Sequence, residues 1–296
     1  MNAAVAAISV DPSMVSKVQR MIDVSHKDPI DYERSIDWKL GVDRSLPPKL
    51  PENCWLYGTP FYDQLTPEQA HELLWLETAR DVTMFLTLER ALPPLYTGYA
   101  NRYEDEIAPE IVDYLLIFSR EEITHTLMFK RYQRLAGLPQ FSLEGILSFF
   151  RDQLPLMPPV AGILMTLLIE WIAELGALSN TQHDSVDPLT RQLFRRHHVD
   201  EARHIAFARW VVESQFASMP EEEVQPIREI ARQQFKRLML AYTYNEEIAR
   251  FTSFPYPVAV GDISQIRAVR FSAHNQELNR KRFAPMTTWL GKVGIL

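Results

Sequence analysis

Over most of its length, the chain alternates between apolar and polar residues at the spacing of α-helices. From Thr66 onward, apolar side chains recur every three or four residues, which places them along one stripe of a helix. The segment 160–180 is apolar on almost every side, as is typical of a helix at the centre of a bundle. These patterns predict helices over residues 66–92, 109–137, 143–153, 160–180, 187–211, 220–251 and 263–282.

Proline, glycine and capping residues mark the expected helix ends. Thr66–Gln69 combines a threonine N-cap, a proline at the first helical position and a glutamine that completes a capping box. Asp187–Pro188 provides a start of the same kind. The pair Pro93–Pro94 is expected to stop the first helix, and Gly137 suits the residue that follows the second.

Residues 1–65 show only weak helical periodicity and hold six of the 20 prolines. Because prolines favour extended backbone, we expect residues 1–65 to form an extended wrap. This wrap should cover the helical bundle formed by residues 66–296 and belong to the same domain. Four aromatic residues should pin this wrap in place: Trp38, Trp55, Tyr57 and Phe61.

Composition agrees with one helical domain. The 296 residues are 46% hydrophobic and 23% charged, which is enough apolar surface for a sizeable core. Only ten glycines occur, and no segment alternates with the period of a strand, so we predict an all-α protein.

Charge and cysteine content exclude several classes of function. The net charge is −7 with dispersed acids and no basic stripe, so nucleic acid is not an expected partner. Cys54 is the only cysteine, which excludes an intrachain disulfide and thiolate metal sites. The N-terminus lacks the pattern of a signal peptide, and the longest apolar run, 159–169, is short for a membrane span. We therefore expect a cytoplasmic protein without a membrane partner.

The first candidate functional residues lie in the predicted helix over residues 187–211. His197, Glu201 and His204 stand at i, i+4 and i+7, so they share one stripe of a helix with apolar residues such as Phe194 and Ala208. A carboxylate buried between two imidazoles is costly unless a cation compensates it. The spacing therefore predicts half of a metal site.

Three further predicted helices supply the rest of the candidate metal site. Glu122 and His125, at i and i+3, interrupt the apolar stripe of the helix over residues 109–137. One Glu-x-x-His is common on solvated faces, but two on core stripes, with a Glu from each of two other helices, form the dinuclear carboxylate site of ferritin-like bundles. The predicted metal ligands are Glu89, Glu122, His125, Glu170, His197, Glu201 and His204.

Neighbouring carboxylates leave some choices open. Glu170 and Glu174 compete for one ligand position, and we favour Glu170 because it precedes Glu201 by 31 residues (201 minus 170), as in the usual diiron register. Glu174 is then expected beside the ligands or in a channel. Glu77 is a weaker rival to Glu89 and lies off the stripe.

A carboxylate also precedes each glutamate of the two Glu-x-x-His motifs. Such a group can reach across to the histidine of the opposite helix and orient it. We therefore expect Asp200 to contact His125 and Glu121 to contact His204; the alternative is that both carboxylates face solvent.

These motifs resemble the AurF-type non-haem diiron N-oxygenases, typified by p-aminobenzoate N-oxygenase. That family has a Glu, then Glu-x-x-His, then a Glu, then His-x-x-x-Glu-x-x-His. The extra histidine of the last element, which most ferritin-like diiron proteins lack, is His197 here, and Glu170 precedes it by 27 residues (197 minus 170). The similarity covers about Thr66 to Val211.

The resemblance implies a ferritin-like or ribonucleotide-reductase-like bundle with additional helices and two Fe ions that change between Fe2+ and Fe3+. It implies that O2 is the co-substrate and that an amine nitrogen is oxygenated to a hydroxylamine, nitroso or nitro group in specialised metabolism. No nucleotide-binding or nucleophile-elbow motif is present, so we expect no bound flavin, haem or nicotinamide and an external electron donor, a ferredoxin or a reductase. A homodimer is also expected.

Three alternative functions stay open. The same oxidant can act on a C–H bond, as in a hydroxylase or desaturase. A ribonucleotide-reductase-like radical subunit would have a tyrosine one turn after His125, where this chain has Phe129. A ferritin-like iron store would assemble as a cage of smaller bundles.

The substrate itself is not determined by the motifs. It can be an aromatic amine, an amino acid, or an aminoacyl group tethered to a carrier protein. Arg267 and Arg270 are candidate residues for holding a substrate carboxylate.

Overall fold

A computed structural model describes residues 8, 12–143, 145, 148–178, 181 and 183–296. No β-strand occurs among these residues, where only a backbone bridge joins Ile8 to Ile107, so the all-α prediction is confirmed. The helices are α1 (Pro12–Lys27), α2 (Tyr32–Ser35), α3 (Pro67–Arg102), α4 (Pro109–Leu135), α6 (Pro159–Leu178), α7 (Pro188–Ser218), α8 (Glu221–Thr243), α9 (Ile263–Arg270), α10 (Ala273–Arg282) and α11 (Ala284–Lys292).

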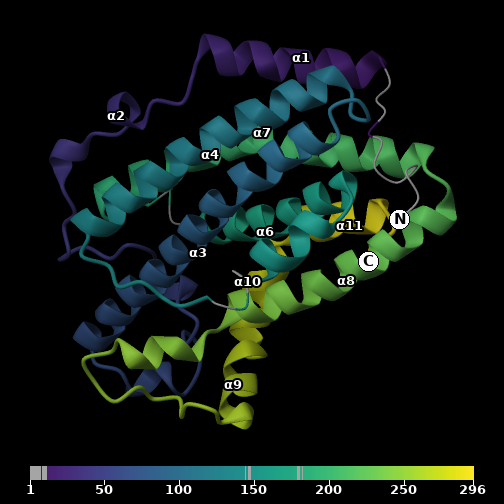
Figure 1. The fold of residues 1–296 in the computed structure, drawn as a ribbon. Helices are drawn as coiled ribbons and strands as arrows, with labels where there is room; N and C mark the ends of the chain where they lie inside the picture. The colour runs from purple at the N-terminus through teal and green to yellow at the C-terminus, as the bar shows by residue number, and fades with distance from the viewer. Residues whose placement is uncertain (1–7, 9–11, 144, 146–147, 179–180, 182) are drawn as a thin grey trace.

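Four long helices form the bundle that carries the predicted ligands. α3 packs along α4, α6 packs along α7, and α3 also contacts α6 (Figure 1). α8 packs against α6, and α1 contacts α4 and α7. The apolar stripes of α3, α4, α6 and α7 therefore converge on one interior, where the polar residues that interrupt them must meet.

The prediction that Pro93–Pro94 stops the first helix is wrong, because α3 continues to Arg102. A proline inside a helix removes a hydrogen bond and usually costs about 3 kcal/mol. Here the turns beyond the prolines are held by tertiary contacts: the Tyr96 hydroxyl lies 2.6 Å from Thr166 Oγ1, and the Tyr99 hydroxyl donates to the Leu154 carbonyl. These buried contacts outweigh the tendency of the two prolines to end the helix.

The expectation of an extended N-terminal wrap also needs correction, because Pro12–Lys27 is a helix. Met14, Val18, Met21 and Ile22 are buried on its inner side, at the i, i+4, i+7 spacing of an amphipathic helix. Beyond α2 the segment contains only short helical turns. Trp38 and Trp55 are buried, as expected of pinning residues.

Three C-terminal boundaries differ from the predicted ones. The helix expected over residues 220–251 ends at Thr243, because Tyr244 is extended, and a short 3-10 turn covers Glu246–Arg250. The helix expected over 263–282 is divided into α9 and α10, since the Ser272 side chain caps α10. α11 was not predicted.

Of the helix expected over 143–153, residues 144 and 146–147 lie outside the described residues, and Phe149–Gln153 forms a π-helical turn.

α6 is the most apolar helix and lies inside the bundle. It is long and apolar enough to cross a membrane, but 94% of its most apolar window is buried within the protein, which accounts for its composition. Gly162 and Gly176 leave room for the hydroxyl groups of Tyr99 and Tyr242, which would collide with any Cβ atom. The helix can therefore pack closely against α3 and α8.

A buried ion pair holds the N-terminal segment against α3. Lys49 Nζ lies 2.8 Å from Glu77 Oε2, and Glu77 Oε1 accepts a hydrogen bond from the Trp55 backbone N–H. Both side chains are almost completely buried. The Cys54 thiol also donates to Glu77 Oε1, at 3.3 Å. Glu77, the weaker candidate for the metal site, therefore serves as an anchor whose partners are a lysine, a thiol and the backbone.

We expect Lys49→Met to lower the free energy of unfolding by roughly 3–5 kcal/mol, because it leaves the Glu77 carboxylate buried without its cation. Urea denaturation followed by circular dichroism measures this change. The double variant Lys49→Met/Glu77→Met removes both charges and should recover most of the loss. A single variant as stable as the wild type would show that the pair does not anchor the segment.

Candidate metal centre

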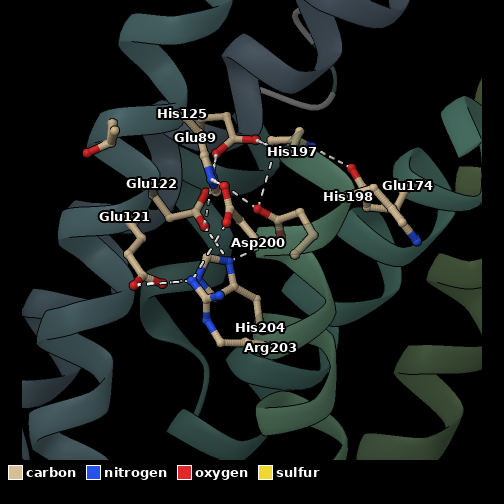
Figure 2. Close-up of polar contacts among 12 residues, drawn as sticks. Glu89, Glu121, Glu122, His125, Glu174, His197, His198, Asp200, Arg203 and His204 are labelled. Carbon is tan, nitrogen blue, oxygen red and sulfur yellow. Dashed lines mark hydrogen bonds and ion pairs between the residues drawn. The ribbon is translucent and has the colours of Figure 1, made fainter. Parts of the chain in front are cut away.

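Six of the seven predicted ligands meet in one buried cluster (Figure 2). α3 contributes one residue, α4 two and α7 three, and none is more than 3% exposed: Glu89, Glu122, His125, His197, Glu201 and His204. Their ligand atoms form two overlapping groups of four residues, with all atoms of a group within 4.8 Å of one another. His125 and Glu201 belong to both groups, so the two groups are adjacent.

Each histidine directs one ring nitrogen at the carboxylates of the cluster. His197 Nε2 lies 3.0 Å from Glu89 Oε1, and His125 Nδ1 lies 3.0 Å from Glu201 Oε1. His204 Nδ1 lies 2.8 Å from Glu122 Oε1. Three nitrogen donors and several carboxylate oxygens thus point to a common volume, as a metal site requires.

The other ring nitrogen of each histidine faces an outer carboxylate. Glu121 Oε2 lies 2.8 Å from His204 Nε2, and Asp200 Oδ2 lies 3.6 Å from His125 Nε2, so the predicted cross-helix pairs are present and buried. Glu174 Oε1 lies 2.6 Å from His197 Nδ1. Such a partner sets the tautomer and the orientation of an imidazole ligand.

Two arginines and one histidine that the sequence analysis overlooked complete this outer layer. Arg196 Nη2 lies 2.8 Å from Asp200 Oδ1, and Arg203 Nη2 lies 3.6 Å from Glu121 Oε1. His198 Nδ1 lies 3.0 Å from the second oxygen of Glu174. The i, i+4 spacing of Arg196 and Asp200 is the signal from which the first pair could have been predicted.

Glu170 is buried on α6, but neither of the two four-residue groups includes it. Both of its carboxylate oxygens lack a hydrogen-bond partner, whereas Glu174 contacts two histidines. Burial raises the pKa of Glu170 well above its usual range, and the charges of Glu201 and Glu122 raise it further. Of the two rivals on α6, Glu170 is therefore the carboxylate free to bind a cation.

The electrostatics of the cluster fit a pair of divalent cations. Burial, followed by repulsion from Glu89 and Glu201, raises the pKa of Glu122, so the carboxylates oppose one another's ionisation. Burial lowers the pKa of His197. The opposite effect of the Glu174 and Glu201 carboxylates is larger and raises this pKa to about 10. Bound dications would offset the repulsion between these carboxylates. Oxygen and nitrogen donors without thiolate suit iron or manganese.

Aromatic rings enclose the histidines. The Phe118 ring stacks on His204 with centroids 3.7 Å apart, and the rings of Phe85 and Phe129 contact His197 at 5.0 and 4.8 Å. An apolar wall keeps water out and strengthens the electrostatic interactions inside. Phe129 carries no hydroxyl group, so this position has no tyrosine that could hold a radical.

The two predicted substrate residues lie elsewhere. Arg267 and Arg270, on α9, do not contact the cluster and instead line a cavity of about 730 Å³ between α6, α8 and α9.

Comparison with known protein families shows which family this chain belongs to. The sequence matches the family "P-aminobenzoate N-oxygenase AurF" over residues 11–294. The chain belongs to this family. Membership and the buried cluster together support a diiron oxygenase, an oxidoreductase. A comparison with curated proteins gave no match.

Solved structures agree on the fold. One R2-like ligand-binding oxidase variant with an aerobically reconstituted Mn/Fe cofactor matches with a TM-score of 0.58 at 15% identity, over 100% of this chain and 99% of that chain. Another variant, also with an aerobically reconstituted Mn/Fe cofactor, matches with a TM-score of 0.56 at 15% identity, over 97% of this chain and 94% of that one. The ferritin-like fold predicted from the ligand spacing is thus confirmed.

Proposed function

We propose that this protein is a diiron oxygenase that uses O2 to oxidise the nitrogen of an amine substrate, giving a hydroxylamine, nitroso or nitro product in specialised metabolism. The observation that carries the proposal is His197, the third histidine of the cluster, which faces Glu89 and Glu201. Family membership supports the same chemistry, since the family is described by an N-oxygenase.

The residues of the cluster divide into two ligand sets. Glu89, His125, His197 and Glu201 would hold one iron. Glu122, Glu201 and His204 would hold the other, and Glu170 supplies a further carboxylate. When bound, the two irons supply the redox chemistry that activates O2.

The protein's own groups keep this arrangement in place. Glu121 and Glu174 accept hydrogen bonds from the outer nitrogens of His204 and His197, and Asp200 lies 3.6 Å from the outer nitrogen of His125. Carboxylates in these positions would leave the inner nitrogens free to bind a metal. Arg196 and Arg203 offset the charge of Asp200 and Glu121.

Metal identity and partners belong to the same proposal. The two similar solved structures contain aerobically reconstituted Mn/Fe cofactors, so metal analysis should distinguish two irons from a mixed pair. We propose an external ferredoxin or reductase as the electron donor and a homodimer as the assembly. Size-exclusion chromatography with light scattering would separate a dimer from the cage of an iron store.

The function is tested with iron-loaded protein that is chemically reduced, exposed to ¹⁸O2 and offered a panel of amines, with products read by mass spectrometry. We expect label in an N-oxygenated product from an amine such as 4-aminobenzoate. Benzoate, which lacks the nitrogen, is the matched control substrate. Label only in C-hydroxylated products, or desaturation, would replace N-oxygenation by the C–H alternative.

A further inference from the structure

A surface groove between α1 and α7 is lined by cationic side chains. Its volume is about 510 Å³, and its lining consists of Lys17, Arg20, Met21, Val24, Arg203 and Trp210. None of the described residues that line it is acidic. The chain as a whole has a net charge of −7, so three cations without an acid among them reverse that charge locally. Such a patch attracts a negatively charged partner to this face of the protein.

The two cations that α1 contributes to the groove are not paired with acids. Lys17 Nζ lies 5.2 Å from the centroid of the Trp210 ring, and Arg20 donates through Nε to the Ser16 carbonyl. Neither residue forms an ion pair within the part of the chain that the structure describes. Val24 beside them is 47% exposed. The groove therefore combines apolar surface with charged side chains, as protein–protein interfaces do.

Arg203 connects the groove with the carboxylates that surround the metal centre (Figure 2). Its Nη2 lies 3.6 Å from Glu121 Oε1 and 3.8 Å from Asp200 Oδ1. Glu121 contacts His204, and Asp200 contacts His125. Two contacts therefore lead from the groove to each of these two histidines.

A second arginine approaches the same outer carboxylate from α4. Arg120 is half exposed, and its Nη2 lies 3.9 Å from Glu121 Oε1. The same nitrogen donates to the Ser25 carbonyl of α1. Glu121 thus faces arginines of α4 and α7 that both reach the surface beside α1, so the positive charge of this face extends past the groove.

The proposed function requires electrons from another protein, and the position of the groove suits their delivery. Electron transfer slows steeply with distance, so a donor must dock where the protein surface lies close to the metal centre. Electron-transfer complexes are also among the smallest protein interfaces, so a groove of this size is sufficient. The short path through Arg203 and the unpaired cations meet both requirements.

We propose that the groove between α1 and α7 is the docking site of an acidic one-electron donor, an iron–sulfur protein of the ferredoxin class. Carboxylates of the donor would pair with Lys17 and Arg20, which places its iron–sulfur centre above Arg203. Two reduced donors, docking in turn, each lose one electron, and two Fe3+ ions become two Fe2+ ions; no covalent bond forms or breaks. This inference rests on the proposed oxygenase function.

The first test measures binding of an oxidised plant-type [2Fe–2S] ferredoxin, a small acidic protein, to the full-length iron-loaded protein by calorimetry. We expect binding that weakens with added salt. The Kd should rise at least about tenfold in Lys17→Glu/Arg20→Glu, the lower end of the effect of electrostatic steering. Carbodiimide joins a lysine amine directly to a carboxylate, so it should link Lys17 to the ferredoxin, as located by peptide mass spectrometry.

The second test follows electron transfer by anaerobic stopped-flow absorbance. The second-order rate constant for reduction of the iron-loaded protein by reduced ferredoxin should fall at least about tenfold in Lys17→Glu/Arg20→Glu. Reduced phenazine methosulfate, a small uncharged reductant that needs no docking surface, should reduce wild type and variant at the same rate. Lys236→Glu/Arg237→Glu is the matched control, because it reverses the same two charges at exposed residues of α8 outside the groove. Thermal unfolding of both variants shows whether the fold is intact.

Wild-type binding and reduction rates in Lys17→Glu/Arg20→Glu, or an equal loss in the α8 control, would overturn the docking site. A ferredoxin that neither binds nor reduces the wild-type protein would overturn it as well. A variant that changes from dimer to monomer but accepts electrons at the wild-type rate would assign the groove to a second copy of the chain.

Product analysis separates a failure of the docking site from a failure of the oxygenase function. N-oxygenation by the chemically reduced protein, together with absent ferredoxin binding, would refute the docking site alone. Reduction by ferredoxin that depends on Lys17 and Arg20, without any oxygenated product, would refute only the function.

Discussion

Glu201→Ala is expected to abolish loading of the metal pair. The Glu201 carboxylate belongs to both groups of candidate ligands and lies 3.0 to 3.4 Å from a ring nitrogen of each of the three histidines. Losing only an outer partner of a ligand typically costs 10–100-fold in metal affinity, so losing this shared anionic ligand should cost more than about a hundredfold. Glu122→Ala should have the same consequence, since Glu122 faces His204 at 2.8 Å.

The protein is reconstituted with Fe2+ and dialysed, and its metal content per chain is then measured by elemental mass spectrometry. Wild-type protein should retain two irons. Glu201→Gln keeps the shape of the side chain without its charge and should also fail to load, which separates coordination from packing. Glu222→Ala, at an exposed acid of α8, is the control. Full loading of the Glu201 or Glu122 variant would mean that the helices do not supply these ligands, and a wild-type protein with one metal would refute the dinuclear site.

His197→Ala is expected to reduce N-oxygenation far more than metal content. His197 reaches the cluster through Nε2, but the remaining residues still include the two Glu-x-x-His motifs that suffice in other diiron bundles. Some iron should therefore bind, while the ligand set at one metal changes. We expect activity per bound iron to fall by at least about tenfold, the lower end of the effect of losing even an outer partner.

The informative measurement is stopped-flow absorbance after the reduced variant is mixed with O2, combined with metal analysis and product yield. His26→Ala is a matched control, since His26 is exposed in the last turn of α1 and does not belong to the cluster. If His197 only packs the core, its variant should lose stability but show an absorbance change with wild-type spectrum and decay. That outcome would remove the main support for N-oxygenation.

The buried cluster of Glu and His residues was predictable from the sequence because it depends on local spacing. On a helix, residues three, four and seven apart share one face whatever the surroundings, so His197, Glu201 and His204 had to point the same way. The caps at Thr66 and Asp187 are equally local and occur where predicted. A polar group on an otherwise apolar stripe must be buried, so convergence of the four stripes followed from the pattern.

Tertiary structure decided the features that depend on contacts between distant segments. Pro93–Pro94 stays helical because side chains beyond it bond to other helices, and the partnership of Glu174 with His197 requires α6 and α7 at a particular register. The arginine-lined cavity joins residues of α3, α8 and α9 that no local spacing relates. Local pattern determines which face a residue occupies, whereas packing determines what it meets there, since long-range contacts are set by the whole fold.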